Sequence, residues 1–377
     1  MSLEGLSSEE RGRYARHLML PELGVEGQER LKKASVLCVG AGGLGSPLLL
    51  YLAAAGVGRI GIVDGDLVEV SNLQRQVIHG TGSIGGSKAR SAANRIADLN
   101  PHSQVEVHEH MLDSDNALDL IGSYDLVCDG SDNFPTRFLV NDACVLKRRP
   151  LIYGSVQRFD GQVSVFNRSP DSPNYRDLLP EPPPAGAVPS CSEAGVMGVM
   201  PGLIGLLQAT EAIKLITGIG ECLDGRLLVV DALRMRFREL TLRPDPSRPP
   251  IEHLIDYRQL CRPEAPAMNS ISVIDLKALL DSGAEDVVLV DVRNPPEADV
   301  ATIPGGKLIP LAQIEDGGAI DQIRGLAADQ RLFVHCKMGG RSARAVELLA
   351  QQGIIATNVT GGIDAWSQQV DPSVPRY

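Results

Sequence analysis

A glycine-rich turn is the first feature of the sequence that could do chemistry. Residues 40–45 follow the pattern G-x-G-x-x-G and lie between an apolar run, 36–39, and a helix-like segment. Glycines in such a turn let backbone N–H groups approach a phosphate at the positive end of a helix. Asp64 ends the next apolar run, where a carboxylate can accept hydrogen bonds from ribose hydroxyls. The pattern predicts a nucleotide site, but taken alone it also fits an NAD-dependent dehydrogenase.

Charged side chains near this turn distinguish between the two kinds of nucleotide. Arg75 and Lys88 follow Asp64 along the chain, and Asp132 lies just past a strand that ends at Cys128. Two cations and a carboxylate around one glycine loop suit a triphosphate with Mg²⁺ better than a nicotinamide. We therefore expect ATP, and production of NADH would indicate the dehydrogenase instead.

Two cysteines stand apart from the others as candidate nucleophiles. Cys191 lies in a polar loop close to a helix start expected at Ala194, and a helix N-terminus lowers the pKa of a thiol. Cys336 follows a strand and opens a loop with two glycines, whose N–H groups would stabilise a thiolate or persulfide anion. Cys38 and Cys128 fall inside expected strands, and we assign them to the hydrophobic core.

Alternating strands and helices must position these residues. The alternation before residue 170 predicts a doubly wound α/β domain, with a parallel sheet and ligands at the carboxyl ends of its strands. Proline-rich stretches occupy 169–189 and 244–266, and the second separates regions with unrelated patterns. We predict a first domain over 1–243, a linker over 244–269 and a smaller α/β domain over 270–377. The expected strands are 36–39, 60–63, 105–107, 126–128 and 162–166, then 287–291, 332–335 and 357–359.

Composition excludes several classes of protein. The chain has 377 residues and a formal net charge of −11, which argues against a nucleic-acid partner because phosphates need a basic patch. The most apolar stretches, 48–57 and 194–207, are shorter than the ~20 residues of a membrane-spanning helix. The charged N-terminus lacks the apolar centre of a signal peptide. Together with seven irregularly spaced cysteines, these features predict a cytoplasmic enzyme with no membrane segment.

The motifs before residue 243 together carry a family resemblance. Residues 8–243 resemble the MoeB/ThiF adenylyltransferases, which are bacterial relatives of the ubiquitin-activating enzymes. The resemblance implies a Rossmann-like domain in which Gly43 and Asp64 hold ATP, with Asp64 at the ribose, while Asp132 holds Mg²⁺. It also implies a homodimer in which Arg16 reaches the ATP of the partner subunit. The matching stretches are 13–17, 40–45, 64–66, 71–76 and 132–133. The other implied contacts to ATP are Ser71, Asn72, Arg75, Lys88 and Asn133, with Asn72, Arg75 and Lys88 at the phosphates.

The same resemblance bears on Cys191 and on metal binding. Cys191 lies where the family has the cysteine that meets the activated carboxylate. Many members of the family also bind a structural zinc ion through four cysteines. At the matching positions this chain has Asn174, Asp177, Arg248 and Ile251, which cannot supply four zinc ligands, so we predict no zinc site.

The region 270–377 resembles a rhodanese sulfurtransferase domain. The resemblance is carried by residues 291–293, 303–306, 335–342 and 361–366, although Thr302 stands where that family usually has histidine. The spacing from Cys336 to Arg341 is also similar to the anion-binding loop of protein-tyrosine phosphatases, so hydrolysis of an aryl phosphate is a competing activity. A non-catalytic scaffold for a ubiquitin-fold protein is a third alternative, and it would leave Cys336 without a role.

Taken together, the two resemblances imply a bifunctional enzyme. ATP and Mg²⁺ would activate the C-terminal Gly-Gly carboxylate of a ubiquitin-fold sulfur carrier protein. Cys336 would take sulfur as a persulfide from a donor such as thiosulfate or a cysteine desulfurase. Cys191 would either form an acyl thioester or resolve an acyl persulfide as a disulfide, and the sequence does not choose between these routes. The product would be a thiocarboxylated carrier for molybdopterin, thiamine, cysteine or tRNA thiolation.

Overall fold

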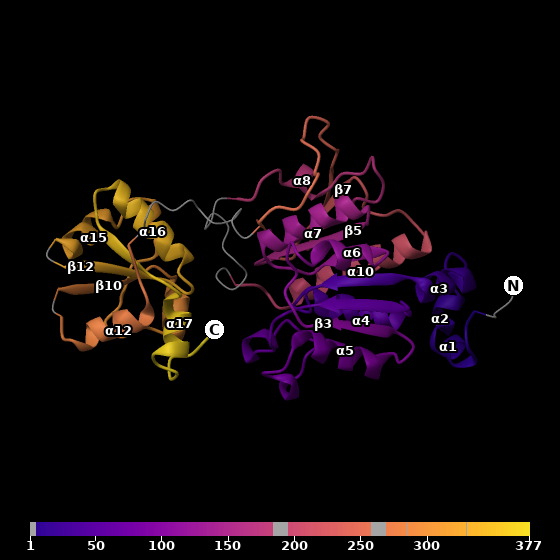
Figure 1. The fold of residues 1–377 in the computed structure, drawn as a ribbon, viewed down its shortest axis with the longest axis horizontal. Helices are drawn as coiled ribbons and strands as arrows, with labels where there is room; N and C mark the ends of the chain where they lie inside the picture. The colour runs from indigo at the N-terminus through magenta and orange to yellow at the C-terminus, as the bar shows by residue number, and fades with distance from the viewer. Residues whose placement is uncertain (1–4, 184–194, 258–268, 285, 329) are drawn as a thin grey trace. The chain divides into compact units, whose positions relative to one another are not determined.

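The computed structural model describes residues 5–183, 195–257, 269–284, 286–328 and 330–377. The chain divides into two compact units, and each is built on its own β-sheet (Figure 1). The N-terminal unit has eight strands with helices on both faces, and the C-terminal unit has five parallel strands. The predicted fold class, a doubly wound α/β domain followed by a smaller α/β domain, is confirmed.

The sheet of the N-terminal unit has the strand order β3-β2-β1-β4-β5-β6-β7-β8. Its first five strands in chain order are parallel, and β6, β7 and β8 are added by antiparallel pairing. The parallel strands are continuous apolar runs because helices cover both faces. The strands are β1 (Ser35–Val39), β2 (Arg59–Val63), β3 (Gln104–His108), β4 (Leu126–Asp129), β5 (Leu151–Gln157), β6 (Asp160–Phe166), β7 (Arg226–Asp231) and β8 (Arg236–Thr241).

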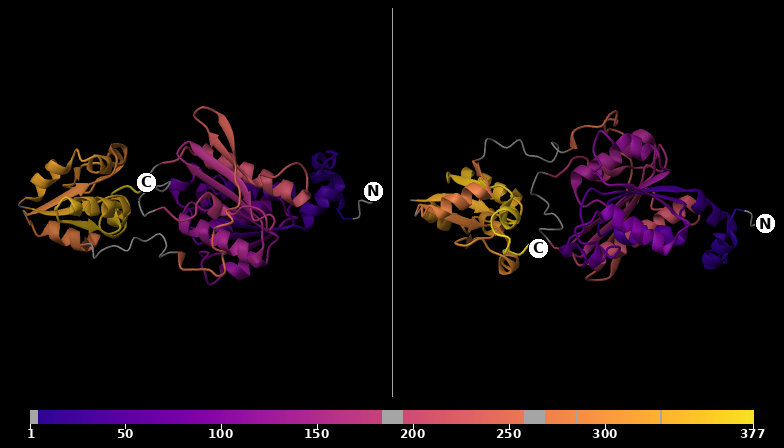
Figure 2. Two further views of the ribbon diagram at one scale, coloured as in Figure 1. Left: turned by 90° about the horizontal axis from the view of Figure 1, so that it is seen from above. Right: turned by 60° about the horizontal axis from the view of Figure 1, so that its bottom comes forward.

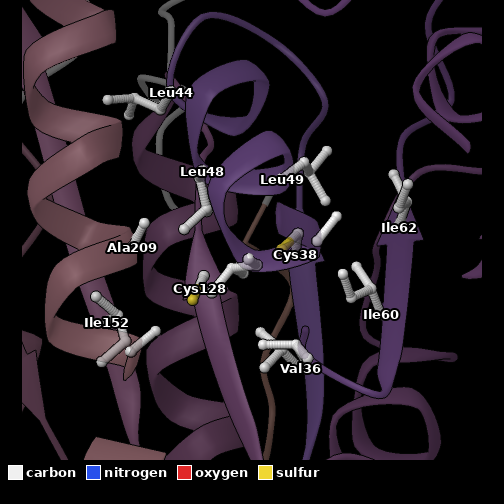
Figure 3. Packing of buried hydrophobic residues seen from close by; sticks show 14 of the residues in the cluster. Val36, Cys38, Leu44, Leu48, Leu49, Ile60, Ile62, Cys128, Ile152 and Ala209 are labelled. Atoms are coloured by element: carbon white, nitrogen blue, oxygen red, sulfur yellow. The ribbon is translucent and has the colours of Figure 1, made fainter. Parts of the chain in front are cut away.

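Helices of the N-terminal unit bury their apolar sides on one face of this sheet or the other. On one face, Leu48 and Leu49 of α4 pack over Val36 and Cys38 of β1 (Figure 3). On the other face α6 and α7 cover the sheet through Ile121 and other buried side chains. Cys38 and Cys128 are buried in adjacent strands, as predicted. The helices are α1 (Ser8–Arg13), α2 (Ala15–Leu18), α3 (Gly24–Lys33), α4 (Gly45–Ala55), α5 (Lys88–Leu99), α6 (Ala117–Gly122), α7 (Phe134–Lys147), α8 (Tyr175–Leu178) and α10 (Val199–Thr217).

The three short helices α1, α2 and α3 gather at one end of the N-terminal unit (Figure 2). Helix α1 begins after Ser7, whose hydroxyl accepts a hydrogen bond from the Glu10 N–H while the Glu10 carboxylate accepts one from the Ser7 N–H. This reciprocal capping satisfies two backbone donors that the first turn of a helix leaves free. Ser7 and Ser8 followed by two glutamates are a sequence pattern typical of such a helix start.

Helix α10 is long and apolar enough, by length and composition alone, to cross a membrane. The apolar stretch predicted from the sequence, 194–207, is too short to cross a membrane. The helix is longer than that stretch, because it continues to Thr217. The helix nevertheless packs inside the unit, against α3, α4, β5 and β6. Its polar side chains bind other parts of the protein: the Gln208 amide donates to the Asp129 carbonyl at 2.7 Å, and Glu211 accepts from the Leu223 N–H at 2.8 Å. These internal bonds are those of a core helix.

The C-terminal unit is a second doubly wound sheet, with the strand order β11-β10-β12-β13-β9. Helices α12 and α17 cover one face, while α14, α15 and α16 cover the other (Figure 1). Its strands are β9 (Ser270–Ile271), β10 (Val287–Asp291), β11 (Lys307–Leu308), β12 (Arg331–His335) and β13 (Ala356–Val359). Its helices are α12 (Val273–Asp281), α13 (Pro295–Val300), α14 (Leu311–Glu315), α15 (Ile320–Ala327), α16 (Gly340–Gln351) and α17 (Gly362–Gln369).

Part of the predicted linker lies against the N-terminal unit. The Tyr257 hydroxyl donates to the Asp142 carboxylate of α7 at 2.6 Å, and the carbonyl of Ile255 accepts from the Ser114 hydroxyl at 2.8 Å. Tyr257 is buried among the residues of that unit. The domain limits at residues 243 and 270 stay a prediction, but the segment before residue 258 is held by hydrogen bonds along the N-terminal unit.

Candidate active sites

The first candidate site is a pocket at the carboxyl ends of β1, β2 and β4. Because β1 lies between β2 and β4, and the helices that follow β1 and β4 cover opposite faces, a crevice opens where these strands end. The glycine turn, Asp64 and the segment 130–133 line this pocket, together with Arg75, Lys88 and Arg137. The topology therefore brings together residues that are almost 100 positions apart in the sequence.

Close backbone packing explains the glycines of the turn. Gly40 has a φ of +91°, and a Cβ on Gly45 would lie only 2.0 Å from the carbonyl oxygen of Gly40. Gly43 faces Pro201 of α10, where a Cβ would lie 2.9 Å from the proline Cβ. These contacts bring the N-terminus of α4 against the ends of β1 and β4. Its positive end favours an anion in the pocket.

Asp64 is tied to the glycine turn by its own carboxylate. Its Oδ2 accepts a hydrogen bond from the Ala41 N–H at 2.8 Å, and its Oδ1 accepts from the Asp66 N–H at 2.8 Å. Burial raises the pKa of Asp64, while these two N–H donors and the Lys88 ammonium act in the opposite direction. Each oxygen keeps a second lone pair, so the carboxylate can also accept hydrogen bonds from ligand hydroxyls.

Arg75 and Lys88 bring positive charge to the pocket wall. Lys88 begins α5, its side chain is only 9% exposed, and its Nζ lies 2.8 Å from the Asp66 carboxylate. Arg75 donates to the carbonyl of Ser71 at 3.0 Å, a neutral acceptor that leaves the guanidinium charge uncompensated by this bond. Cations in a partly water-excluded pocket attract phosphate oxygens more strongly than surface cations do.

Three of the predicted ATP contacts do not line this pocket. Ser71 and Asn72 lie one turn before Arg75, and Arg75 lines the pocket whereas these two residues do not. Arg16 is exposed on α2, which lies at the end of the strands opposite to the pocket. The segment is held there because the amide of Asn100 donates to the hydroxyl of Tyr14, the residue before α2, and to the Ala53 carbonyl. Arg16 therefore cannot serve the pocket of its own chain, and its role at a partner subunit stays a prediction.

Asp132 and Asn133 follow β4 and lie at the pocket. The Asn133 side chain caps α7, because its Oδ1 accepts the N–H of Thr136 at 3.0 Å. Asp132 is exposed, and within the described parts of the chain its carboxylate has no hydrogen-bond or ion-pair partner. One carboxylate beside a phosphate site is a common arrangement for Mg²⁺, which keeps several water ligands. Asp132 therefore fits the metal role predicted for it.

Three polar side chains of the pocket were missed by the sequence analysis. Gln76 Oε1, Ser131 Oγ and Arg137 Nε are buried and have no hydrogen-bond partner among the described residues. A buried polar group without a partner is costly, so such groups mark positions where a ligand or ordered water binds. Arg137 could have been found from its position on the first turn of α7, four residues after the cap Asn133. The Ser131 hydroxyl and the Arg137 Nε–H can donate to phosphate oxygens, Gln76 Oε1 can accept from a ligand hydroxyl or water, and together with the glycine turn they fit ATP.

Cys191 lies outside the residues that the structure describes. The described chain resumes at Gly195, and helix α10 begins at Val199. Val196 pairs with Arg158 as an isolated bridge, and the Met197 N–H donates to the carbonyl of Arg158 at 3.1 Å. Ala194 also lies outside the described residues, so the helix start expected there and its effect on the pKa of Cys191 stay predictions.

The second candidate site is the loop that follows β12. Cys336 is fully buried, its Sγ accepts the N–H of Gly339 at 3.1 Å, and the Ser342 hydroxyl lies 3.4 Å from it. Gly339 has a φ of +103°, a left-handed conformation that turns the loop back over the sulfur. The Ser342 hydroxyl also bonds Asn358 Oδ1 at 2.6 Å. Among the described residues, one N–H donor of the predicted cradle, that of Gly339, therefore reaches the sulfur.

An ion pair between Arg341 and Glu297 anchors the loop that follows Cys336. Both terminal nitrogens of Arg341 lie 2.7 Å from the Glu297 carboxylate, and Glu297 caps α13. Burial would raise the pKa of Glu297, but the Arg341 guanidinium and the Asn294 N–H hold it below its usual range. Tyr377 joins the pair, since its hydroxyl donates to Glu297 at 3.2 Å and accepts from Arg293 at 2.5 Å. A phosphatase needs the loop arginine at the substrate anion, so this pairing disfavours that alternative.

The four positions of the absent zinc ligands form a different kind of junction. Arg248 lies 2.9 Å from both the Asp177 carboxylate and the Asn174 amide oxygen. Asn174 and Asp177 cap α8 reciprocally. Ile251 lines a cavity beside them. Within the described ranges no group of three His, Cys, Asp or Glu side chains could hold a metal ion. An arginine cation binds here, where thiolates are absent.

Comparison with known proteins decides the family. Residues 14–250 match the ThiF family and residues 272–369 match the rhodanese-like domain. The chain belongs to the ThiF family. Its ThiF region contains the whole nucleotide pocket, and its rhodanese-like domain contains the Cys336 loop. The resemblance inferred from the motifs is confirmed for both units, and the ThiF fold implies that the pocket binds ATP.

Relatives with both domains match this member of the ThiF family along almost its full length. It is 51% identical over 382 residues to the probable adenylyltransferase/sulfurtransferase MoeZ of Mycobacterium tuberculosis, covering 99% of this chain and 96% of that protein. It is 44% identical to the adenylyltransferase and sulfurtransferase MOCS3 of Sus scrofa, covering 99% of this chain and 89% of that protein. The chain is accordingly an adenylyltransferase and a sulfurtransferase.

Solved structures support the fold alone. A crystal structure of Escherichia coli MccB with ATP matches 63% of this chain and 73% of its own, with a TM-score of 0.55 and 19% identity. A crystal structure of PaaA matches 65% of this chain and 77% of its own, with a TM-score of 0.53 and 24% identity. These proteins are similar in architecture to the N-terminal unit.

Proposed function

We propose that this enzyme uses ATP to adenylate the C-terminal glycine carboxylate of a ubiquitin-fold sulfur carrier and then converts that carboxylate into a thiocarboxylate. The observation that carries the proposal is the presence, in one chain, of two sites. One is a pocket in which Ser131 Oγ and Arg137 Nε have no partner among the described residues, and the other is a buried cysteine whose sulfur accepts the Gly339 N–H. Neither site alone completes this chemistry, because the first activates a carboxylate and the second stores sulfur. We place the enzyme in the cytoplasm.

In the first half-reaction, an oxygen of the carrier carboxylate forms a bond to the α-phosphorus, and the bond from that phosphorus to the β-phosphate bridging oxygen breaks. Pyrophosphate leaves with the electron pair. Asp64 would hold the ribose, while Arg75, Lys88 and the N-terminus of α4 would oppose the charge of the phosphates. Asp132 would hold Mg²⁺, which when bound neutralises part of that charge.

Three neighbouring residues would complete this nucleotide site. Asn72 reaches the phosphates in the family that the sequence resembles, and here it would need to turn from its place behind Arg75. Ser71 and Asn133 would act mainly through backbone position, since the Ser71 carbonyl holds Arg75 and the Asn133 side chain caps α7.

In the second half-reaction, a persulfide on Cys336 supplies the sulfur. Its terminal sulfur attacks the acyl carbon, the bond from that carbon to the AMP oxygen breaks, and AMP leaves. The Cys191 thiolate can then attack the Cys336 sulfur, which forms a disulfide and releases the thiocarboxylate. In the alternative route Cys191 attacks the adenylate first and holds the carrier as a thioester. In both routes the two cysteines end as a disulfide, because they supply the two electrons that reduce the transferred sulfur. A thiol reductant must open this disulfide before a sulfur donor such as thiosulfate or a cysteine desulfurase reloads Cys336.

The proposal is tested with a Gly-Gly-ended ubiquitin-fold carrier, ATP, Mg²⁺ and thiosulfate. We expect mass spectrometry to show exchange of one oxygen for sulfur at the carrier C-terminus. Asp132→Ala should remove most pyrophosphate exchange, whereas exposed Asp171→Ala should not, because Asp171 lies outside the pocket lining. A carrier that acquires neither AMP nor sulfur, or an Asp132→Ala enzyme with normal exchange, would contradict the proposal.

We also propose that the enzyme acts as a homodimer, since Arg16 lies too far from its own pocket to serve it. Mixing Arg16→Ala protein with Asp132→Ala protein should restore part of the adenylation activity, because hybrid dimers contain one composite site with both residues. Absence of rescue, with subunit exchange verified, would count against the shared site. We further propose that no zinc is bound, and stoichiometric zinc that survives dialysis would overturn this.

A further inference from the structure

His79 connects three walls of the nucleotide pocket through one side chain. It lies in the segment that carries Arg75, and only 7% of it is exposed. Its Nε2 lies 2.8 Å from the carbonyl oxygen of Ala41 in the glycine turn. Its Nδ1 lies 3.0 Å from the hydroxyl of Ser91, on the helix α5 that Lys88 begins. The same imidazole thus touches the glycine turn, α5 and its own segment.

The partners of His79 define its protonation. A carbonyl oxygen can only accept, so Nε2 carries the hydrogen and donates it to Ala41. In a neutral ring Nδ1 is then the acceptor for the Ser91 hydroxyl. Burial lowers the pKa of His79, the nearby Lys88 ammonium lowers it further, and the Ala41 contact and Asp64 oppose them. The neutral ring is therefore the form that suits this position.

The bond to Ala41 fixes the orientation of a peptide group in the glycine turn. The Ala41 N–H is held by the Asp64 carboxylate at 2.8 Å, and the Ala41 carbonyl is held by His79. In a planar trans peptide the carbonyl of Ala41 and the N–H of Gly42 point in opposite directions. Holding the first therefore aims the second away from His79. Gly42 lines the pocket, and within the described residues no hydrogen bond uses its N–H.

We propose that His79 is a positioning residue for the nucleotide: it holds the Ala41 carbonyl so that the Gly42 N–H is presented to a phosphate oxygen. This inference rests on the proposed function, because it requires ATP at the glycine turn. Without the imidazole, glycines on both sides of Ala41 would let this peptide rotate. The donor would then have to be reoriented each time ATP binds, which lowers affinity.

Two isosteric substitutions separate the two bonds of the ring. His79→Gln can place an amide nitrogen near the position of Nε2 and keep the bond to Ala41, whereas His79→Asn reaches only the position of Nδ1 near Ser91. We expect calorimetry with ATP to show about tenfold weaker binding for His79→Asn and His79→Ala, and a change of no more than about threefold for His79→Gln. In pyrophosphate exchange KM for ATP should rise in parallel, with little change in kcat.

The remaining outcomes are also decisive. Thiosulfate-dependent thiocyanate formation reports on the rhodanese-like domain and should be equal in all variants. If the alanine variant does not fold, the glutamine and asparagine pair still provides the comparison. Equal ATP affinity for the Asn and Gln variants, or a fall in thermal stability without any change in ATP affinity, would overturn the inference alone. A wild-type enzyme that does not bind ATP would overturn the proposed function and this inference with it.

Discussion

The nucleotide pocket and the sulfur loop follow strands of similar sheets but differ in how their charged side chains are paired. In the pocket, Ser131 Oγ and Arg137 Nε are buried without a partner among the described residues, and the Asp132 carboxylate is open. In the loop, the Arg341 guanidinium is paired with Glu297, and the sulfur of Cys336 is fully enclosed. The pocket is prepared for a charged ligand from solution, whereas the loop encloses its reactive atom.

This difference follows from what each site must hold. A triphosphate brings its own charge, so the pocket gains affinity from donors that are desolvated in advance and left unpaired. A persulfide carries a single negative charge and is lost to competing thiols, so enclosure by neutral N–H donors suits it better. Substitutions in the pocket should therefore affect activity more than stability. Substitutions in the charges behind the loop should do the reverse.

The largest expected effect comes from the enclosed sulfur itself. Cys336→Ala should reduce thiosulfate-dependent thiocyanate formation by roughly 10³-fold or more, because the nucleophile is removed. Adenylation of the carrier should remain close to wild type, since ATP binds in the other unit. Cys222→Ala, which changes a partly exposed thiol away from both sites, is the matched control. Sulfur transfer that survives in Cys336→Ala would break the comparison, because the loop would then not be the site of sulfur chemistry.

Lys88 tests whether a pocket cation serves the ligand or the fold. Lys88→Met should reduce pyrophosphate exchange by about 10²-fold, as loss of one charge-stabilising donor commonly does. Asp66→Asn removes the partner of the same ion pair but leaves the ammonium, so it should lower exchange far less. Equal losses of exchange in the two variants, accompanied by equal losses of thermal stability, would show that the pair is structural.

Arg248 extends the comparison to a charge that is paired, with Asp177, outside the lining of the nucleotide pocket. Arg248→Ala leaves the buried Asp177 carboxylate without its guanidinium and should lower the unfolding free energy by about 2 kcal/mol. ATP affinity should hardly change. Arg236→Ala, at an exposed arginine of β8, controls for removal of a positive charge. Denaturant titration measures the difference, and an unchanged midpoint would mean that this junction does not hold the fold.

Glu297 gives the smallest effect, and it depends on pH. The pKa of Glu297 is lower in the folded unit than in the unfolded chain. Its pairing therefore contributes stability that is present above the unfolded-state pKa and is lost as the pH falls through the folded-state pKa. Glu297→Gln should lower the stability of the C-terminal unit by about 1 kcal/mol at neutral pH and by less in acid. Thermal melts across this range measure it. A variant that stays equally destabilised at every pH would show that charge is not the cause.

Much of the fold was predictable because its signals are local. Buried parallel strands are short apolar runs, and the helical periodicity of residues 88–99 in the sequence corresponds to α5. The gathering of Asp64, Lys88 and Asp132 followed from the rule that ligands bind at the carboxyl ends of parallel strands. The bridge from Val196 to Arg158, a residue 38 positions earlier, could not be predicted in the same way. No local pattern reports such a contact.

The missed site residues have the same explanation. Arg137 and Ser131 become important because tertiary packing buries Arg137 Nε and Ser131 Oγ without a partner among the described residues, and a sequence shows neither burial nor missing hydrogen bonds. The role of His79 likewise depends on an acceptor 38 residues earlier in the chain. The sequence does not show how far Arg16 lies from the pocket of its own chain. That distance follows from the position of α2 at the far end of the strands.

The junction of Asn174, Asp177 and Arg248 has a consequence for how this enzyme meets its chemical surroundings. A cage of four thiolates must acquire a metal, competes for it with other proteins, and can be emptied when peroxide or disulfides oxidise its sulfur. The guanidinium of Arg248 is part of the chain from synthesis and has no sulfur partner to lose. Under the proposed function the enzyme meets persulfides and thiosulfate, and helix α8 is then anchored by groups that these sulfur compounds cannot attack.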